Sequence, residues 1–163
     1  MNKGLLVVFL ISQSLYATAS DQTACQAAGG SYLTGVVTSA PKFQSASETL
    51  QGVKLSHTTL NIKSDQNGKT YQVAMDNVYA ADYVKNSTSI PKSLAALKVN
   101  THLELCGELY TGGDIGIHWV HDNCSTTPSS SNPNGWTKVL ATNGTAGANL
   151  ENSQTYCYLW GEN

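Results

Sequence analysis

The chain has 163 residues, of which 12% are charged, and its formal net charge at pH 7 is −2. All nine basic residues are lysines, and they are scattered among the acidic residues. This composition argues against a nucleic-acid partner, because phosphate recognition needs clustered basic side chains.

Residues 1–20 have the pattern of a signal peptide. Lys3 provides a basic start, an apolar run follows, and Ala17 and Ala19 occupy the small-residue positions that precede a cleavage site. The apolar run is too short to span a bilayer, and no comparable stretch follows it. We therefore expect a secreted or periplasmic protein without a membrane span, in which residues 21–163 form a single domain. The alternative is a short buried N-terminal helix.

Three β-strands are predicted in the first half of the chain, at residues 32–38, 52–64 and 69–79. The second and third are joined by Asn67-Gly68, a dipeptide typical of hairpin turns. Within the second, the apolar residues change from one face to the other near Ser56-His57-Thr58, which predicts a bulge or a strand start at that point.

The second half begins with one short helix and continues with strands. The helix is predicted at residues 92–98, and strands at 99–110 and 114–123. After a loop rich in serine, proline and asparagine, a C-terminal β-hairpin is predicted from residues 136–140 and 156–160.

The order strand, hairpin, short helix, strand, strand is typical of an OB-like five-stranded barrel. We therefore predict an all-β fold with one short helix, consisting of this barrel and a C-terminal β-hairpin extension that begins at about residue 125. A small β-sandwich is the competing architecture.

Four cysteines in an exported chain indicate two disulfides rather than a zinc site, because none of them forms a C-x-x-C pair. Three pairings are open. We favour Cys124 with Cys157, which would close the loop rich in serine, proline and asparagine, and Cys25 with Cys106.

The chain has four histidines, and two of them stand in the sequence His118-Trp119-Val120-His121. On a strand, residues three apart point to opposite faces with Cα atoms roughly 10 Å apart, so the pair cannot chelate one metal ion. We expect His121 to share the more apolar face with Trp119 and to reach the barrel rim. His118 is expected to be half-buried between the sheet and the hairpin.

The topology of an OB barrel brings distant polar residues to one rim. Its second and third strands are antiparallel and its third and fifth are parallel, so the start of the second meets the ends of the other two. The candidate binding residues at this rim are His57, Asp76, Asn77, His118, Trp119, His121, Asp122 and Trp136. Three of them, His57, His121 and Asp122, could ligate a divalent metal ion. The alternative is a solvated polar rim with turn-capping side chains.

Four stretches of the sequence together suggest a family resemblance. In chain order they are "SHTTLNI", "MDNVYAA", "LELCGELYTGGDIGIHWVHDNC" and "PNGW". Over residues 31–138 the chain resembles an uncharacterised family of small exported bacterial OB-like proteins with an H-W-x-H strand and a downstream G-W. The family pattern falls on His57, Asn77, His118, Trp119, His121, Asp122, Gly135 and Trp136. The chain departs from it at Asp76, where the family leads us to expect histidine, and in the longer loop after Cys124. The resemblance implies a fold but no reaction.

The leading functional hypothesis is a secreted or periplasmic binding module that recognises a protein, a glycan or a small ligand at the rim. Three tryptophans offer stacking surfaces, and we expect at least two to be internal and Trp136 to be the most exposed. The alternative is a metal-dependent hydrolase of the phosphodiesterase type that uses the same His and Asp side chains. In a third interpretation the imidazoles only join the barrel to its hairpin.

Overall fold

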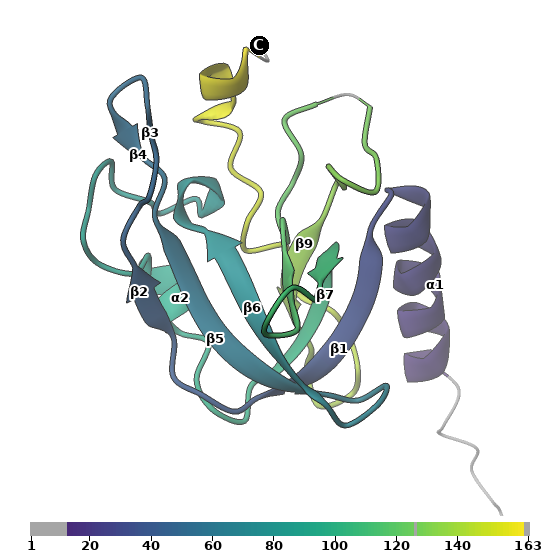
Figure 1. Ribbon diagram of the computed structural model, residues 1–163. Helices are drawn as coiled ribbons and strands as arrows, with labels where there is room; N and C mark the ends of the chain where they lie inside the picture. Colours follow the sequence, from purple (N-terminus) through teal and green to yellow (C-terminus); the bar gives the residue numbers. More distant parts are fainter. Residues whose placement is uncertain (1–12, 126, 162–163) are drawn as a thin grey trace, which may run out of the picture.

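The computed structural model describes residues 13–125 and 127–161. Five strands close into a barrel in the order β1-β5-β6-β8-β7, and β7 pairs with β1 to complete the circle (Figure 1). Their bounds are β1 Ser31–Val37, β5 His57–Ser64, β6 Thr70–Asp76, β7 His102–Tyr110 and β8 Gly116–His118. Only the β6–β8 pair is parallel among these barrel pairings. This is the predicted OB-like barrel, with the short helix α2 (Lys92–Ala95) between its third and fourth strands.

Two further strands are bonded outside the barrel. β2 (Lys42–Gln44) pairs with β5, and β9 (Trp136–Val139) pairs with β7. The remaining elements are a small ribbon of β3 (Thr49–Leu50) and β4 (Val53–Lys54), the helix α1 (Gln13–Ala27), and two 3-10 turns, η1 (Asn77–Tyr79) and η2 (Cys157–Trp160). The predicted signal peptide lies partly outside the described residues, and its last residues belong to α1, which lies beside β1 (Figure 1).

The barrel core follows the predicted alternation of apolar residues. Side chains two apart on a strand share a face, and those that face inward here are almost fully buried. The pairs from three barrel strands are Leu60 and Ile62, Val73 and Met75, and Leu103 and Leu105. Leu94 and Leu97 from the α2 region join the same cluster. The predicted strand start is also present, because β5 begins at His57.

The strand predicted at 114–123 is shorter than expected, because it ends at His118. Trp119 has a φ of 54°, a left-handed conformation that an extended strand cannot contain. The alternation of faces is lost there, so Val120 lies in the core together with Ile117. The predicted common face of His121, Trp119 and Ile117 is therefore wrong.

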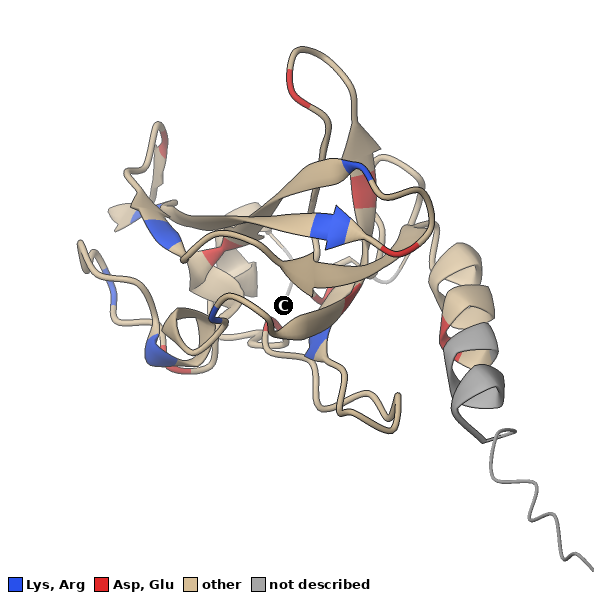
Figure 2. Ribbon diagram, turned by 90° about the horizontal axis from the view of Figure 1, so that it is seen from below, with Lys and Arg blue, Asp and Glu red and all other residues tan. Residues whose placement is uncertain are grey.

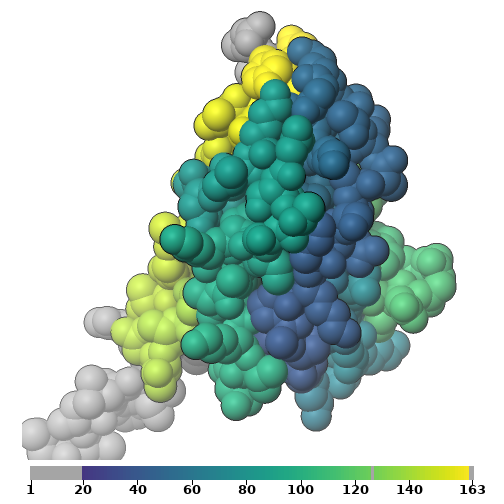
Figure 3. All heavy atoms as spheres, turned by 90° about the vertical axis from the view of Figure 1, so that its left-hand side faces the viewer, coloured from purple at the N-terminus to yellow at the C-terminus, as the bar shows by residue number. Residues whose placement is uncertain are grey.

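The C-terminal extension also differs from the predicted hairpin in its second arm. Residues 156–160 were expected as a strand, but Cys157–Trp160 form η2, which ends at Gly161 with a φ of 76°. No other strand pairs with them among the described residues. They lie instead near the β3–β4 ribbon (Figure 3), where the Gln51 side-chain amide donates to the Tyr158 carbonyl at 3.5 Å.

The sequence suggested that Trp136 is the most exposed tryptophan, and this prediction is wrong. Trp136 is half-buried at the start of β9, and its indole Nε1 donates to Oε1 of Glu104 at 3.0 Å. Glu104 is completely buried, and its other oxygen accepts from the Tyr32 hydroxyl at 2.9 Å. The indole of Trp136 is therefore held by the pairing of β9 with β7 and by its hydrogen bond to the buried carboxylate of Glu104. Trp160, with 42% of its surface exposed, is the accessible indole instead.

Both disulfides have the favoured pairing. Cys25–Cys106 joins α1 to β7, and Cys124–Cys157 joins the chain after β8 to η2 across 33 residues. Two disulfides fit an oxidising compartment. Lysines and acidic residues are spread over strands and loops rather than gathered on one face in Figure 2. Within residues 13–125 and 127–161, no helix has the length and apolar character needed to cross a membrane.

Candidate functional site

Three strand ends bring His57, Asp76 and His121 together. His57 opens β5 and lies opposite Asp76, the last residue of β6, in the antiparallel register. The parallel pairing of β6 with β8 aligns Val73 with Ile117, so the chain that leaves β8 passes Asp76. His57 Nε2 lies 2.6 Å from Oδ1 of Asp76, and His121 Nε2 lies 3.3 Å from Oδ2. One carboxylate thus bridges two imidazoles.

The two imidazoles decide the charge state of Asp76. Burial by itself would raise the pKa of this carboxyl, but hydrogen bonds from His121 and His57 outweigh burial and hold the pKa well below its usual range. The carboxylate remains ionised whenever the protein is folded at ordinary pH. It therefore serves as a fixed acceptor for both rings.

His57 is the more accessible of the two rings, with 34% of its side chain exposed. Its hydrogen bond with Asp76 raises its pKa, and burial opposes this rise only in part. Nε2 is committed to Asp76, whereas Nδ1 has no partner among the described residues. His57 is thus oriented by a carboxylate and keeps one ring nitrogen free.

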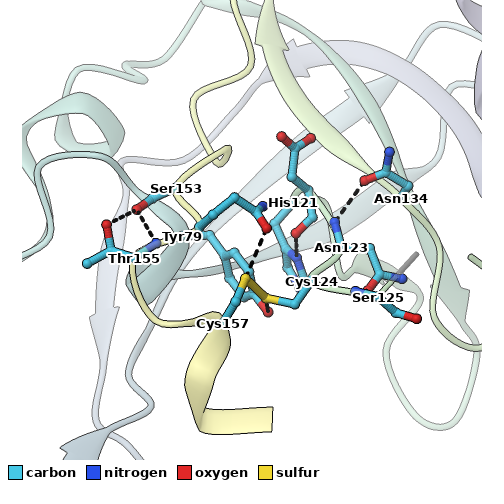
Figure 4. The surroundings of a disulfide bond; sticks show 11 residues. Tyr79, His121, Asn123, Cys124, Ser125, Asn134, Ser153, Thr155 and Cys157 are labelled. Carbon is cyan, nitrogen blue, oxygen red and sulfur yellow. Dashed lines mark hydrogen bonds between the residues drawn. A yellow bond between two sulfur atoms is a disulfide. The ribbon is translucent and has the colours of Figure 1, made fainter. Parts of the chain in front are cut away.

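His121 is buried in an aromatic stack. Its Nδ1 lies 2.9 Å from the carbonyl oxygen of Asp122, and its ring lies 3.7 Å from that of Tyr79 with an angle of 7° between the planes (Figure 4). On its other side Tyr79 stacks on Trp160 at 5.6 Å. The stack runs from a buried imidazole to an exposed indole.

The Cys124–Cys157 disulfide fixes this stack to the C-terminal segment. Figure 4 shows Tyr79 beside the disulfide, and the Tyr79 hydroxyl lies 3.5 Å from Sγ of Cys124. The backbone N–H of Ser153 also donates to the Tyr79 carbonyl at 2.8 Å. The position of Trp160 therefore depends on a cross-link and on η1, and not on the barrel strands.

Glu151 lies behind the imidazole pair and is completely buried. Its Oε2 accepts from the backbone N–H of Asp76 at 3.2 Å, while Oε1 has no partner among the described residues. Burial, together with the negative charge of Asp76, raises the pKa of Glu151 well above its usual value. The sequence offers no signal for it, because it lies in a C-terminal loop without periodicity.

A pocket of about 580 Å³ opens beside these groups at the barrel rim. His57, Asp76 and His121 contribute to its wall, together with the aromatic rings of Tyr79, Trp119 and Trp160. The other lining residues are Ser47, Glu48, Leu55, Val78, Asn123, Cys124, Ser125 and Asn132. No lysine lines it among the described residues. The volume suits a small molecule.

Four of the predicted rim residues lie outside the pocket lining. Asn77 is buried and bonds the hydroxyls of Thr58 and Ser56, and Trp136 bonds Glu104. The remaining two are His118, whose Nε2 lies 2.9 Å from Oε2 of Glu108, and Asp122, whose Oδ1 accepts from Asn149 at 3.0 Å. Sequence reasoning brought the two histidines and Asp76 together but missed Tyr79, Trp160 and Glu151.

The described residues contain no group of three or more His, Cys, Asp or Glu side chains that could hold a metal ion. The predicted ligand set of His57, His121 and Asp122 is not assembled, because the Asp122 carboxyl turns towards Asn149 and both imidazoles direct Nε2 at Asp76.

His118→Ala is expected to cost about 0.5–1.5 kcal/mol of stability, because it removes one half-exposed hydrogen bond to Glu108 and a ring contact with Tyr110. Thermal melting measures this loss. The imidazole NMR signals of His57 should keep the pH dependence that they have in the wild type, and a change would show that His118 is coupled to the pocket.

No protein-family model, curated protein or solved structure matches this chain.

Proposed function

We propose that this protein is a secreted or periplasmic binding module that takes a small sugar into the pocket at the barrel rim. The observation that carries the proposal is the aromatic stack of Trp160, Tyr79 and His121 along one wall of that pocket. Export is part of the proposal, and the two disulfides support it because such bonds persist in oxidising compartments.

A sugar ring has a flat face of C–H groups and an edge of hydroxyls. The exposed indole of Trp160 offers a surface for the C–H face, because aromatic rings present large apolar area at low cost in conformational entropy. Partners for the hydroxyls are also present. The Asn132 amide, the Ser47 hydroxyl and Nδ1 of His57 have no side-chain hydrogen-bond partner within the described part of the chain. An apolar wall with a few unpaired polar groups is typical of small-ligand sites.

No observation favours the metal-dependent hydrolase predicted as the alternative. Both imidazoles use Nε2 to bind Asp76, and the described residues hold no set of ligands for a metal ion. We therefore propose ligand binding rather than metal-dependent hydrolysis.

Trp160→Ala is expected to weaken sugar binding about two- to tenfold, because stacking on an aromatic ring contributes about 0.5–1.5 kcal/mol. Isothermal titration with a panel of neutral, amino and acidic monosaccharides and disaccharides measures the affinity. The matched control is Tyr158→Ala, on the same 3-10 turn, whose ring is 39% exposed but does not line the pocket. It should leave the affinity unchanged.

Two results would contradict this proposal. One is the absence of binding by every sugar in the panel to the folded, oxidised wild-type protein. The other is equal loss of affinity in Trp160→Ala and Tyr158→Ala, which would assign binding to the turn as a whole and not to the pocket wall.

A further inference from the structure

We propose that the sugar carries a carboxylate, and that this carboxylate binds at Nδ1 of His57 together with one proton. This inference rests on the proposed function and names the chemical class of its ligand. It follows from a count of hydrogens and charges around Asp76.

The count begins with His121, whose two ring nitrogens both face oxygen acceptors. Nδ1 faces the carbonyl oxygen of Asp122 at 2.9 Å, and Nε2 faces Oδ2 of Asp76 at 3.3 Å. Neither oxygen can donate, so each nitrogen must carry a hydrogen for the contact to be attractive. In the arrangement in which both contacts are hydrogen bonds, the His121 ring carries two hydrogens, and its positive charge is balanced by the Asp76 carboxylate.

His57 then determines the net charge of the cluster. Its Nε2 donates to Oδ1 of Asp76 at 2.6 Å, which fixes one hydrogen and leaves Nδ1 of this pocket-lining ring without a partner among the described residues. With Nδ1 unprotonated, the cluster of His57, Asp76 and His121 is neutral. With Nδ1 protonated, its charge is +1, and the free N–H can donate to an anion.

The other ionisable groups near the cluster are acids, which carry no positive charge in either protonation state. Glu151 and Asp122 have a raised pKa because of burial, and burial likewise raises the pKa of Tyr79 above its usual value. Glu48 lies at the pocket edge with an exposed side chain, where its charge is screened by water. No lysine lines the pocket within the described residues, so the protonated ring of His57 is the group that we expect to bind an anionic ligand.

A carboxylate fits this arrangement better than a neutral hydroxyl or a dianion. One free N–H matches one carboxylate oxygen, and a hydrogen bond between two charged groups is about twice as strong as one between neutral groups. The carboxylate in turn favours the protonated ring, as Asp76 already does on the other nitrogen. A dianion such as phosphate would leave one negative charge uncompensated.

The test compares matched pairs of sugars that differ in the carboxylate. D-glucuronate and D-galacturonate are titrated calorimetrically against the full chain beside D-glucose and D-galactose, at pH 5.5 and pH 8.0, in two buffers of different ionisation enthalpy. We expect the uronates to bind more tightly than their neutral partners and to lose up to tenfold in affinity per pH unit once His57 is deprotonated in the free protein. Where His57 is deprotonated in the free protein, the buffer dependence of the enthalpy should report the uptake of a proton on binding.

His57→Gln is the variant that tests the site of the proton. Its amide can still donate to Asp76 but cannot titrate, so the preference for uronates and the pH dependence should both disappear. The matched control is His102→Gln, since His102 pairs with Asp65 at the same 2.6 Å but lies outside the pocket. That variant should bind like the wild type, and circular dichroism confirms that both variants are folded.

Three outcomes separate the two proposals. Neutral sugars that bind as tightly as uronates at both pH values would overturn this inference and leave the proposed function intact. A pH-dependent preference for uronates that persists in His57→Gln would also overturn it, because the proton would then be elsewhere. If neither the uronates nor the neutral sugars bind, both this inference and the proposed function of sugar binding are overturned.

Discussion

Asp76→Asn is expected to destabilise the protein by about 3–5 kcal/mol, which is the usual cost of removing one partner from a buried ion pair. The carboxylate accepts from two imidazoles, one on each oxygen. An asparagine offers one oxygen and one NH₂ group, so one of the two rings would face a donor instead of an acceptor. The buried ring of His121 would also lose its contact with a carboxylate oxygen. Urea denaturation at pH 6 measures the loss.

The chain supplies a matched control in Asp65→Asn. Asp65 pairs with His102 at 2.6 Å, the same distance as between Asp76 and His57, but the two side chains are 43% and 40% exposed. An exposed pair contributes about 0–1 kcal/mol. Similar losses in the two variants would show that burial and the second imidazole add nothing at Asp76, which would remove the electrostatic basis of the site.

The meeting of His57 and Asp76 could be predicted from the sequence because it depends only on strand order and register. The Asn67-Gly68 turn fixes the hairpin, and the change of apolar face near His57 marks where β5 begins. The parallel pairing of the third and fifth strands then brings His121 to the same rim. These are local patterns combined with one topological rule.

The aromatic wall could not be predicted in this way. Tyr79 lies on a 3-10 turn, and Trp160 lies on another whose position is set by the Cys124–Cys157 disulfide and not by strand pairing. Residues 156–160 have the composition of a strand, but within the part of the chain that the structure describes no strand pairs with them. Trp119 adopts a left-handed conformation that a tryptophan rarely takes, so no propensity rule would place the break there.

Glu151→Gln is expected to make the protein more stable than the wild type above about pH 5, with a difference that grows by about 1.4 kcal/mol per pH unit until the folded-state pKa of Glu151 is reached. In the folded wild type, burial and the Asp76 charge raise the pKa of Glu151 well above the 4.5 of a free glutamate. The folded state therefore keeps a proton that the unfolded state releases. The contribution of this group to stability is complete below pH 4.5 and is lost as the pH rises. A glutamine is neutral at every pH and can still accept from the N–H of Asp76.

Two other groups set the pH range in which the wild type is most stable. Asp76 has a lowered pKa, so its contribution is present above about pH 4 and is lost as the pH falls. His57 has a raised pKa, so its contribution is complete below pH 6.5 and is lost as the pH rises through the folded-state value. Together with Glu151, whose contribution is complete only below about pH 4.5, they place the stability maximum near pH 4 to 4.5.

The difference between the unfolding free energies of wild type and Glu151→Gln, measured by urea denaturation from pH 4 to pH 8.5, isolates the proton on Glu151 from those on Asp76 and His57. At pH 4.5 the two proteins should differ little, which makes that point an internal control for packing damage. A difference that stays constant with pH would mean that Glu151 is ionised in the folded protein. The cluster would then hold one more negative charge, and His57 would have to remain protonated to balance it even without a ligand.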